Sequence, residues 1–316
     1  MENLRPKARH VSVAAEQAEQ RLDNFLLREL KGVPKGHVYR LLRTGQVRVN
    51  GRRAKPDYRI AGGDEIRIPP LRQSEPGPQV RPGSRQQAVL QAAIVHEDEF
   101  LLALNKPAGW AVHGGSGVSL GVIEALRAMR PGDRHLELVH RLDRDTSGCL
   151  LVARKPAALR ALHAALRTGQ VDKRYLALLA GVWSGGPRQV RVALQKNVLQ
   201  SGERMVKVAE DGREAESHFQ PIRRFRDATL MEAAIRTGRT HQIRVHAAHL
   251  GHPVLGDEKY GAREANRHFR ALGLKRMFLH AASLGFVHPA TGVPMQVIAP
   301  LDAQLQALLD RLEPID

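Results

Sequence analysis

The segment HRLDRDTSG, residues 140–148, places several charged groups between two apolar stretches of the chain. Asp143 lies between Arg141 and Arg144, and a carboxylate beside fixed cations keeps its negative charge. Such a carboxylate suits nucleophilic or base catalysis at a sugar. Asp145 precedes the run TSG, whose composition is typical of a tight turn. On these residues alone, both a solvated hairpin turn and a catalytic Asp143 remain open.

A second group of polar side chains lies in the segment TGRTHQIRVHAAHLGH, residues 237–252. Arg239 and His241 fall in its first part, which has the composition of a turn, and the apolar spacing that follows predicts a helix containing Arg244. A basic helix of this kind can bind RNA phosphates and hold a carboxylate as its charge partner. At this stage a solvated surface cation explains Arg244 equally well.

A metal site is the alternative use of the same segment. His246 and His249 stand three residues apart, so on a helix they could share a metal ion. No carboxylate stands at a metalloprotease spacing and no cysteine is near. A metal-dependent hydrolase is therefore kept as an alternative hypothesis, and no metal is expected.

The charge balance predicts a polyanionic partner. Lys and Arg number 49 against 32 Asp and Glu, which gives a formal net charge of +17, and nucleic acid is the usual partner of such a chain. No run approaches the length of a membrane span and the N-terminus has no apolar signal core, so we expect a cytoplasmic protein with no membrane partner. Cys149 is the single cysteine, which excludes an internal disulfide and a Cys-rich zinc site.

The N-terminal module has the pattern helix, helix, small antiparallel sheet. Apolar spacing predicts helices at residues 21–30 and 37–45. The alternation in QVRVNGRRA predicts a strand followed by an Asn50-Gly51 hairpin turn, and DEIRIP predicts a closing strand. Basic residues gather around the second helix and the hairpin. The predicted RNA-phosphate contacts are Arg40, Arg43 and Arg48.

Proline and glycine mark the boundary between the two parts of the chain. Residues 71–90 are rich in Pro, Gly and Arg, and we expect a linker there without a periodic element. Residues 19–70 then form one domain and residues 91–316 a second one. Short alternating strands broken by a few helices predict an α+β fold in the second domain, with a mixed, mainly antiparallel sheet flanked by helices.

Four segments, HRLDRDTSG, KRYLAL, TGRTHQIRVHAAHLGHPVLGD and FLHAASLGFVHPATG, closely resemble the RluA-type pseudouridine synthases. The N-terminal module, with VRVNG and AGGDEIRIP, resembles an S4-type RNA-binding domain. This resemblance extends from about residue 20 to 305. It implies an S4-like domain followed by a pseudouridine synthase domain. The activity implied is the isomerisation of uridine to pseudouridine in large-subunit ribosomal RNA or its assembly precursor.

The resemblance also implies roles for individual residues. The essential aspartate of the family falls on Asp143, its base-stacking tyrosine on Tyr175, and the arginine that pairs with the aspartate on Arg244. Arg141 is expected to fill the gap left by the extracted uridine. The remaining RNA or substrate contacts expected in this domain are His140, Arg239 and His241.

The implied reaction needs neither redox chemistry nor an energy source, so no cofactor is expected. No obligate protein partner is expected, and a monomer is favoured. A non-catalytic RNA-binding factor for ribosome assembly is the main alternative. It would have no need to keep the set Asp143, Tyr175 and Arg244, and the sequence has all three.

Overall fold

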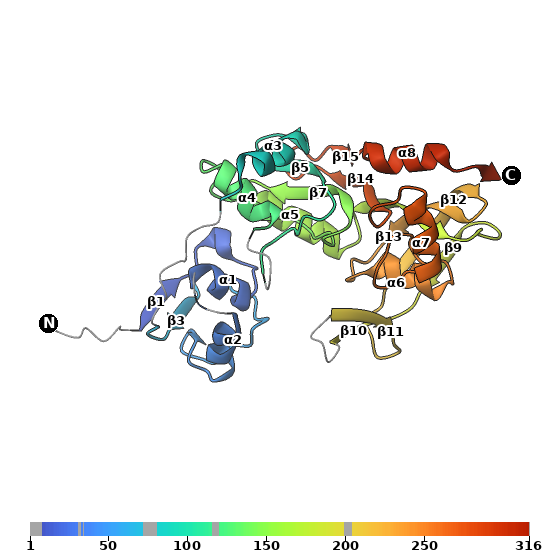
Figure 1. The fold of residues 1–316 in the computed structure, drawn as a ribbon. Helices are drawn as coiled ribbons and strands as arrows, with labels where there is room; N and C mark the ends of the chain where they lie inside the picture. The colour runs from blue at the N-terminus through green and yellow to red at the C-terminus, as the bar shows by residue number, and fades with distance from the viewer. Residues whose placement is uncertain are drawn as a thin grey trace. The chain divides into compact units, whose positions relative to one another are not determined.

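The computed structural model describes residues 8–30, 33, 35–71, 81–115, 120–198 and 204–315, and it divides into two compact units, Met1–Val80 and Arg81–Asp316 (Figure 1). Residues 72–80 of the expected linker lie outside the described residues. The same holds for residues 116 and 117 of the glycine-rich segment HGGSG, residues 113–117.

The N-terminal unit has two helices packed on a three-stranded sheet. Its elements are β1 (Arg9–Ser12), the short 3-10 helix at Ala15–Gln17, α1 (Leu22–Glu29), α2 (Lys35–Arg43), β2 (Arg48–Val49) and β3 (Glu65–Ile68), with strand order β1-β3-β2. Asn50 and Gly51 turn the chain with φ of 50° and 76°, as Asn-Gly chemistry favours. The expected helix, helix and sheet are present. The boundary at residue 19 is too late for this sheet, because β1 pairs with β3 along its length.

The expectation that residues 71–90 lack any periodic element is wrong at its C-terminal end. Helix α3 (Ser84–Ala92) begins there, directly after Gly83. The sequence SRQQAVLQA contains no proline or glycine, and its residues are mostly good helix formers. Leu90 is the buried residue of the helix and packs into the core of the second unit. Composition averaged over the whole proline-rich stretch conceals this short helical run.

The second unit is built on an 11-stranded sheet with the path β16-β12-β13-β8-β14-β7-β5-β4. Strands β6, β9 and β15 pair with β7, β12 and β14 outside this path. The strands are β4 (Ile94–Glu97), β5 (Leu101–Lys106), β6 (Glu137–Leu138), β7 (Ser147–Ala153), β8 (Asp172–Ala180), β9 (Arg188–Arg191), β12 (Glu216–Phe225), β13 (Ala228–Ile235), β14 (Leu279–Val287), β15 (Pro294–Ile298) and β16 (Pro314–Ile315). Among the described strands only β14 and β7 pair in parallel, so the expected mixed, mainly antiparallel sheet is confirmed.

Helices lie around the large sheet, and two further strands form a separate hairpin. The helices after α3 are α4 (Val122–Met129), α5 (Pro156–Arg167), α6 (Gln242–His249), α7 (Arg263–Ala271) and α8 (Ala303–Arg311). The hairpin is β10 (Leu194–Val198) with β11 (Arg204–Val208). Figure 1 shows α3, α4 and α5 around β5 and β7, whereas α6 and α7 lie near β12 and β13. Helices α3, α4 and α5 therefore lie beside other strands of the sheet than α6 and α7 do.

A glycine permits the close parallel pairing that follows the HRLD segment. Gly148 has φ of 107°, and a Cβ atom there would lie 2.2 Å from the carbonyl oxygen of Ala281 on β14. A side chain at this position would force β7 and β14 apart. The start of β7, and with it the loop that precedes it, is therefore set directly against β14.

Candidate active site

Asp143 lies in the loop between β6 and β7. The backbone N–H of Thr146 donates to the Asp143 carbonyl oxygen at 3.2 Å, which closes a turn. The Arg144 carbonyl oxygen accepts from the Gly109 N–H at 2.9 Å, and the Arg144 guanidinium donates to the Gly109 carbonyl at 3.1 Å. The turn is thus tied to the end of β5 as well as to β7, so the position of the Asp143 carboxylate does not rest on the hairpin alone.

Lys106 is the buried support of this turn, a role that was not apparent from the sequence. Its ammonium group donates to the carbonyl oxygens of Pro107 and Trp110 at 2.9 Å each and of Arg144 at 3.0 Å, and its side chain is fully buried. Three acceptors match the three donors of an ammonium group. Burial lowers the pKa of Lys106 to about 7, although the charges of Asp145 and Asp143 oppose the shift. A buried lysine has no access to RNA, so its function is structural.

Arg244 reaches Asp143 from a distant part of the chain. It projects from α6, whose N-cap residue, His241, is in the left-handed region at φ of 54°. Its Nη1 atom lies 3.3 Å from the Asp143 Oδ2 atom across 101 residues of sequence. Arg244 is only 5% exposed, so it is not the solvated cation that the helix pattern left open. The predicted pairing of Arg244 with Asp143 is therefore present as a geometry.

Asp257 holds the other edge of the same guanidinium group. Its carboxylate accepts from Arg244 Nε at 2.6 Å and from Nη2 at 2.7 Å, and its side chain is fully buried. The backbone N–H groups of Lys259 and Tyr260 also donate to it. Burial raises the pKa of Asp257, but the hydrogen bonds and charge of Arg244 outweigh it and lower the pKa overall. Arg244 is thus shared by two carboxylates, of which Asp257 has the stronger contacts.

Tyr260 connects this ion pair to His241 and to the hairpin. Its ring centroid lies 5.1 Å from the Arg244 guanidinium carbon. The Val206 N–H of β11 donates to the Tyr260 hydroxyl oxygen at 2.8 Å, so the hydroxyl proton is free to donate to His241 Nδ1, also at 2.8 Å. His241 Nε2 then faces Asp143 Oδ2 at 3.8 Å. Burial lowers the pKa of His241, and the Asp143 charge opposes that shift.

Tyr175 lies on β8 with small residues on both sides. It pairs with Ala233 of β13 and with Ala281 of β14, which places two methyl groups beside the ring. Tyr175 is 8% exposed. Its hydroxyl group has no hydrogen bond to any described residue. Burial and then the charge of Asp143 raise the pKa of Tyr175, so its phenol is neutral at physiological pH. Tyr175 is therefore a largely buried ring with small cross-strand neighbours.

The other residues predicted to contact RNA in this unit lie in different environments. Arg141 and Arg239 are exposed, and Arg239 also donates to the Glu214 carbonyl oxygen at 3.0 Å. His140 Nε2 accepts from the Leu151 N–H of β7 at 3.1 Å. Burial lowers the pKa of His140 to about 4, so its ring is neutral. The contacts of these residues with RNA stay predictions. If His140 contacts RNA, it does so with a neutral ring.

The predicted phosphate contacts of the N-terminal unit are all on its surface. Arg40, Arg43 and Arg48 are exposed, and Arg48 donates to the Gly51 carbonyl oxygen at 3.1 Å. Arg40 lies 3.4 Å from a ring nitrogen of His37. In the part of the chain that the structure describes, none of the three arginines forms an ion pair with a carboxylate. Their charges are therefore available to a ligand.

His246 and His249, which suggested a metal site, lie in different environments. His246 is fully buried on α6, and burial lowers its pKa to about 4, whereas His249 is exposed. Within the described ranges no three His, Cys, Asp or Glu side chains are grouped so that they could hold a metal ion. The geometry offers no support for a metal-dependent hydrolase.

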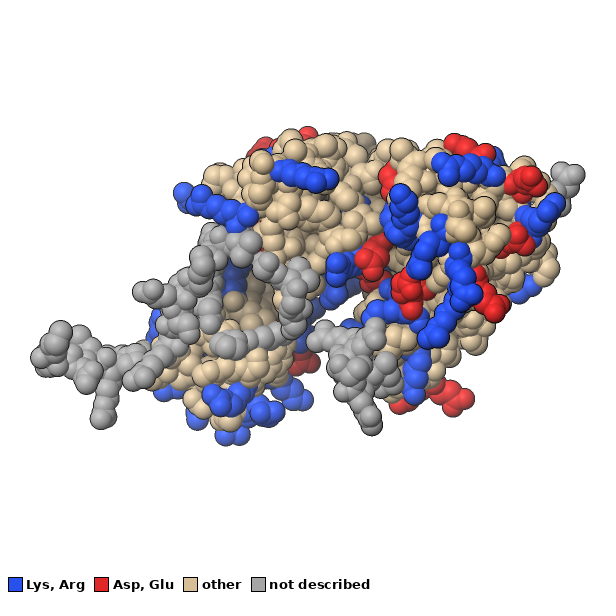
Figure 2. All heavy atoms as spheres, in the orientation of Figure 1, with Lys and Arg blue, Asp and Glu red and all other residues tan. Residues whose placement is uncertain are grey.

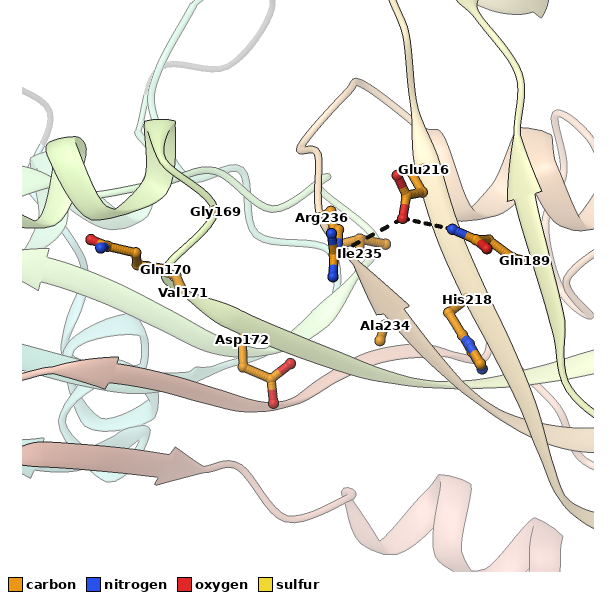
Figure 3. A pocket seen from close by; sticks show the side chains of 10 residues that line it. All are labelled: Gly169, Gln170, Val171, Asp172, Gln189, Glu216, His218, Ala234, Ile235 and Arg236. Carbon is orange, nitrogen blue, oxygen red and sulfur yellow. Dashed lines mark hydrogen bonds and ion pairs between the residues drawn. The ribbon is translucent and has the colours of Figure 1, made fainter.

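A hollow of about 520 Å³ lies near the start of β8 (Figure 3). It is lined by Gly169, Gln170, Val171, Asp172, Gln189, Glu216, His218, Ala234, Ile235 and Arg236. Asp172 and Tyr175 are three residues apart on one strand, so their side chains point to opposite faces. Figure 3 shows Glu216 between Arg236 and Gln189, and Gln189 donates to it at 2.9 Å. The Asp172 side of this hollow is therefore separated from Tyr175 by the sheet.

Comparison with known protein families places two models on the chain. Residues 100–249 match the model described as RNA pseudouridylate synthase, and residues 20–66 match the S4 domain. The first range contains Asp143, Tyr175 and Arg244, whereas Asp257 and Tyr260 lie beyond its end.

Similar proteins cover nearly the whole chain. A protein named ribosomal large subunit pseudouridine synthase C from Yersinia pestis is 53% identical over 98% of this chain and 97% of its own length. A protein of the same name from Escherichia coli (strain K12) is 51% identical over 99% of both chains. Among solved structures, Human RNA Pseudouridylate Synthase Domain Containing 1 is 28% identical, with a TM-score of 0.60 over 75% of this chain and 92% of its own.

Proposed function

The chain belongs to the RNA pseudouridylate synthase family, and from this premise we propose that it isomerises specific uridines of large-subunit ribosomal RNA with Asp143 as the essential catalytic group. The observation that supports the assignment most strongly is the contact of Asp143 with a buried Arg244 from a distant helix. Relatives with 51–53% identity that are named ribosomal large subunit pseudouridine synthase C support the choice of RNA.

Asp143 begins the reaction at the sugar. The N1–C1′ bond of uridine breaks, the base turns, and a C5–C1′ bond forms, while the C5 proton leaves and N1 gains a proton. Nothing is oxidised or reduced and no atom is added overall. The carboxylate either attacks C1′ or removes a sugar proton to give a glycal, and both routes need an ionised group. Arg244 contacts this carboxylate at 3.3 Å and orients it toward the substrate.

Tyr175 holds the freed base while it turns. A base that stacks on the ring is restrained in one plane and can still rotate within it. The cross-strand neighbours of Tyr175 are the small residues Ala233 and Ala281. Since the phenol stays neutral, its hydroxyl group can take part in a hydrogen bond where the C5 proton leaves.

Arg141 and the N-terminal unit deal with the RNA rather than with the reacting base. A uridine inside folded RNA must be flipped out, which costs a few kcal/mol. Arg141 is exposed on the catalytic loop and fills the vacated position in the stack. His140, Arg239 and His241 contact the flipped nucleotide or its neighbours. The S4-like unit binds phosphates through its exposed arginines, which gives affinity without base readout.

The enzyme acts in the cytoplasm as a monomer, without a cofactor or an obligate protein partner, on ribosomal RNA or on its assembling precursor. Its excess of Lys and Arg supports an RNA partner of this kind. No described helix is both long and apolar enough to cross a membrane.

An exchange of one side-chain group tests the assignment. The Asp143→Asn variant and the wild type are incubated with large-subunit rRNA from cells that lack the gene, and pseudouridine is mapped by carbodiimide labelling and primer extension. The wild type restores specific pseudouridines, while the variant binds this rRNA with nearly unchanged affinity and restores none. Turnover by the variant within about tenfold of the wild type would overturn the role of Asp143.

A further inference from the structure

Helix α7 presents a basic stripe that the proposed chemistry does not use. Arg263, Arg267 and Arg270 are spaced four and three residues apart, so they fall within about 60° of one another around the helix. All three are exposed, whereas Phe269 is buried and attaches the opposite side of the helix to the core. Figure 2 shows Lys and Arg side chains along the position of α7 in Figure 1.

The charges of this stripe are only partly neutralised. Arg263 and Arg267 form no ion pair or hydrogen bond through their side chains with any described residue. Arg270 meets Glu258 at 2.6 Å, but these side chains are 65% and 74% exposed. An ion pair so exposed to water contributes little, so Glu258 does not prevent Arg270 from meeting another anion. Like charges four residues apart, as Arg263 and Arg267 are, cost a helix about 0.2–0.5 kcal/mol.

Two hydrogen bonds fix the stripe to the candidate active site. Asn266 donates from its side-chain amide to the Asp257 carbonyl oxygen at 2.9 Å and accepts from the Gly256 N–H at 2.8 Å. The Asp257 carboxylate in turn binds Arg244. Asn266 is adjacent to Arg267 in sequence, so the helix cannot shift without moving the loop that orients the catalytic ion pair. A ligand held on the stripe is therefore held in register with Asp143.

We propose that Arg263, Arg267 and Arg270 on α7 bind the phosphate backbone of the RNA strand that flanks the target uridine. The stripe spans about 10 Å along the helix axis, and it offers guanidinium groups, which bind phosphate oxygens through two parallel hydrogen bonds. Lys275, exposed and without a described partner, extends the positive surface beyond the helix. Phosphate contacts carry no sequence information directly, so in this role the stripe adds affinity and register. This inference rests on RNA being the substrate and extends the proposed function to a second RNA contact.

The test compares two double variants of the full-length protein that remove the same charge. Arg263→Gln with Arg267→Gln changes the stripe. Arg85→Gln with Arg134→Gln is the matched control, because both residues are exposed, form no described ion pair and lie on α3 and after α4. Glutamine keeps a similar helix propensity to arginine, so both proteins are expected to fold. The dissociation constant for large-subunit rRNA transcribed in vitro is measured from about 50 to about 300 mM KCl, the range over which phosphate contacts change affinity steeply.

Loss of two phosphate contacts lowers the slope of log affinity against log salt by about 1.4, on the basis of about 0.7 per contact with a single strand. The RNA concentration that half-saturates the initial rate rises as well. The control pair keeps the wild-type slope. A stripe variant whose slope equals that of the control overturns the proposal, and this result is also expected if the stripe binds an acidic protein surface instead. The salt slope measures binding alone, so the isomerase assignment can fail independently of this proposal. In that case no pseudouridine would form, while the stripe variant would still have a lower salt slope than the control pair.

Discussion

Asp257 accepts two hydrogen bonds of 2.6 and 2.7 Å from the guanidinium group of Arg244. These are the shorter contacts of this group, since it also contacts Asp143. Asp143 has one contact of 3.3 Å to the remaining nitrogen. Arg244 is therefore fixed in place by Asp257 and presented to Asp143. The contact to Asp143 is thus single and longer than either hydrogen bond to Asp257.

Replacement of Asp257 by Asn is expected to destabilise the protein and to slow isomerisation. Removal of one partner of a buried ion pair leaves an uncompensated charge and costs about 3–5 kcal/mol. The free energy of unfolding is measured by urea denaturation, and the single-turnover rate with saturating rRNA is measured where the variant is folded. Asp172→Asn is the control. Asp172 is half-exposed, pairs with Arg174, and lies with it on the face of the sheet opposite to Tyr175. Equal effects of the two variants would contradict the positioning role of Asp257.

Replacement of Tyr175 by Phe separates stacking from the hydroxyl group. Phenylalanine keeps the aromatic surface between Ala233 and Ala281, so rRNA affinity should stay within about twofold of the wild type. If the neutral hydroxyl assists departure of the C5 proton, the single-turnover rate falls by about 100-fold, at the low end for a group that takes part in proton transfer. Tyr175→Leu removes the stack as well and should fall further. A Phe variant with the wild-type rate would confine Tyr175 to stacking.

Burial of Lys106 predicts a specific dependence of stability on pH. The pKa of this lysine is about 7 in the folded protein, against an ordinary value of 10.5, so between these pH values the unfolded chain binds more protons than the folded one. Stability therefore rises with pH in this window, with a limiting slope of about 1.4 kcal/mol per pH unit from this group. The free energy of unfolding is measured at the lower end of this window, at about pH 7, and inside it, at about pH 9, for the wild type and for Lys106→Met.

The methionine variant should lose that pH-dependent gain, since it has no titrating group at this position. It should also be less stable at neutral pH, because the part-buried carbonyl oxygens of Pro107 and Trp110 lose the Lys106 donor, with a cost of about 1–3 kcal/mol for each group left unsatisfied. The Arg144 carbonyl oxygen loses the same donor but keeps its hydrogen bond from the Gly109 N–H. The comparison cancels the titration of every other group. If both proteins gain the same stability across the window, Lys106 does not titrate in this range.

Neutralisation of Arg40, Arg43 and Arg48 tests the phosphate contacts of the N-terminal unit. All three are exposed, so glutamine at each position should leave the fold intact. Three lost contacts lower the salt slope of rRNA binding by about 2–3. Arg28→Gln with Arg59→Gln provides a comparison on the same unit. A triple variant with the slope of the wild type would show that the S4-like unit binds RNA through another surface.

Periodicity predicted the main secondary structure because apolar spacing reports contacts within a few residues. The helix that carries Arg244 and the strand that carries Tyr175 follow from it. The residues HRLD pointed to Asp143 through their resemblance to a family. The proline content of residues 71–90 was misleading, since composition says little about a nine-residue helix at the end of the stretch.

The tertiary structure decided which charges meet. Asp257 ends one of the four segments that resemble the family, but local composition does not predict its burial, which depends on α6 and α7 packing around the loop between them. Lys106 has the sequence context of a cation at the end of a strand, and only the return of the chain at Arg144 brings it its third carbonyl oxygen. Ion pairing across 101 residues depends on strand order and register, which are set by the whole sheet. Local patterns in the sequence therefore indicate the residue types and elements of this site, and the family resemblance indicates the pair Asp143 and Arg244. The other partners, Asp257 and the carbonyl oxygens around Lys106, depend on the packing of the whole domain.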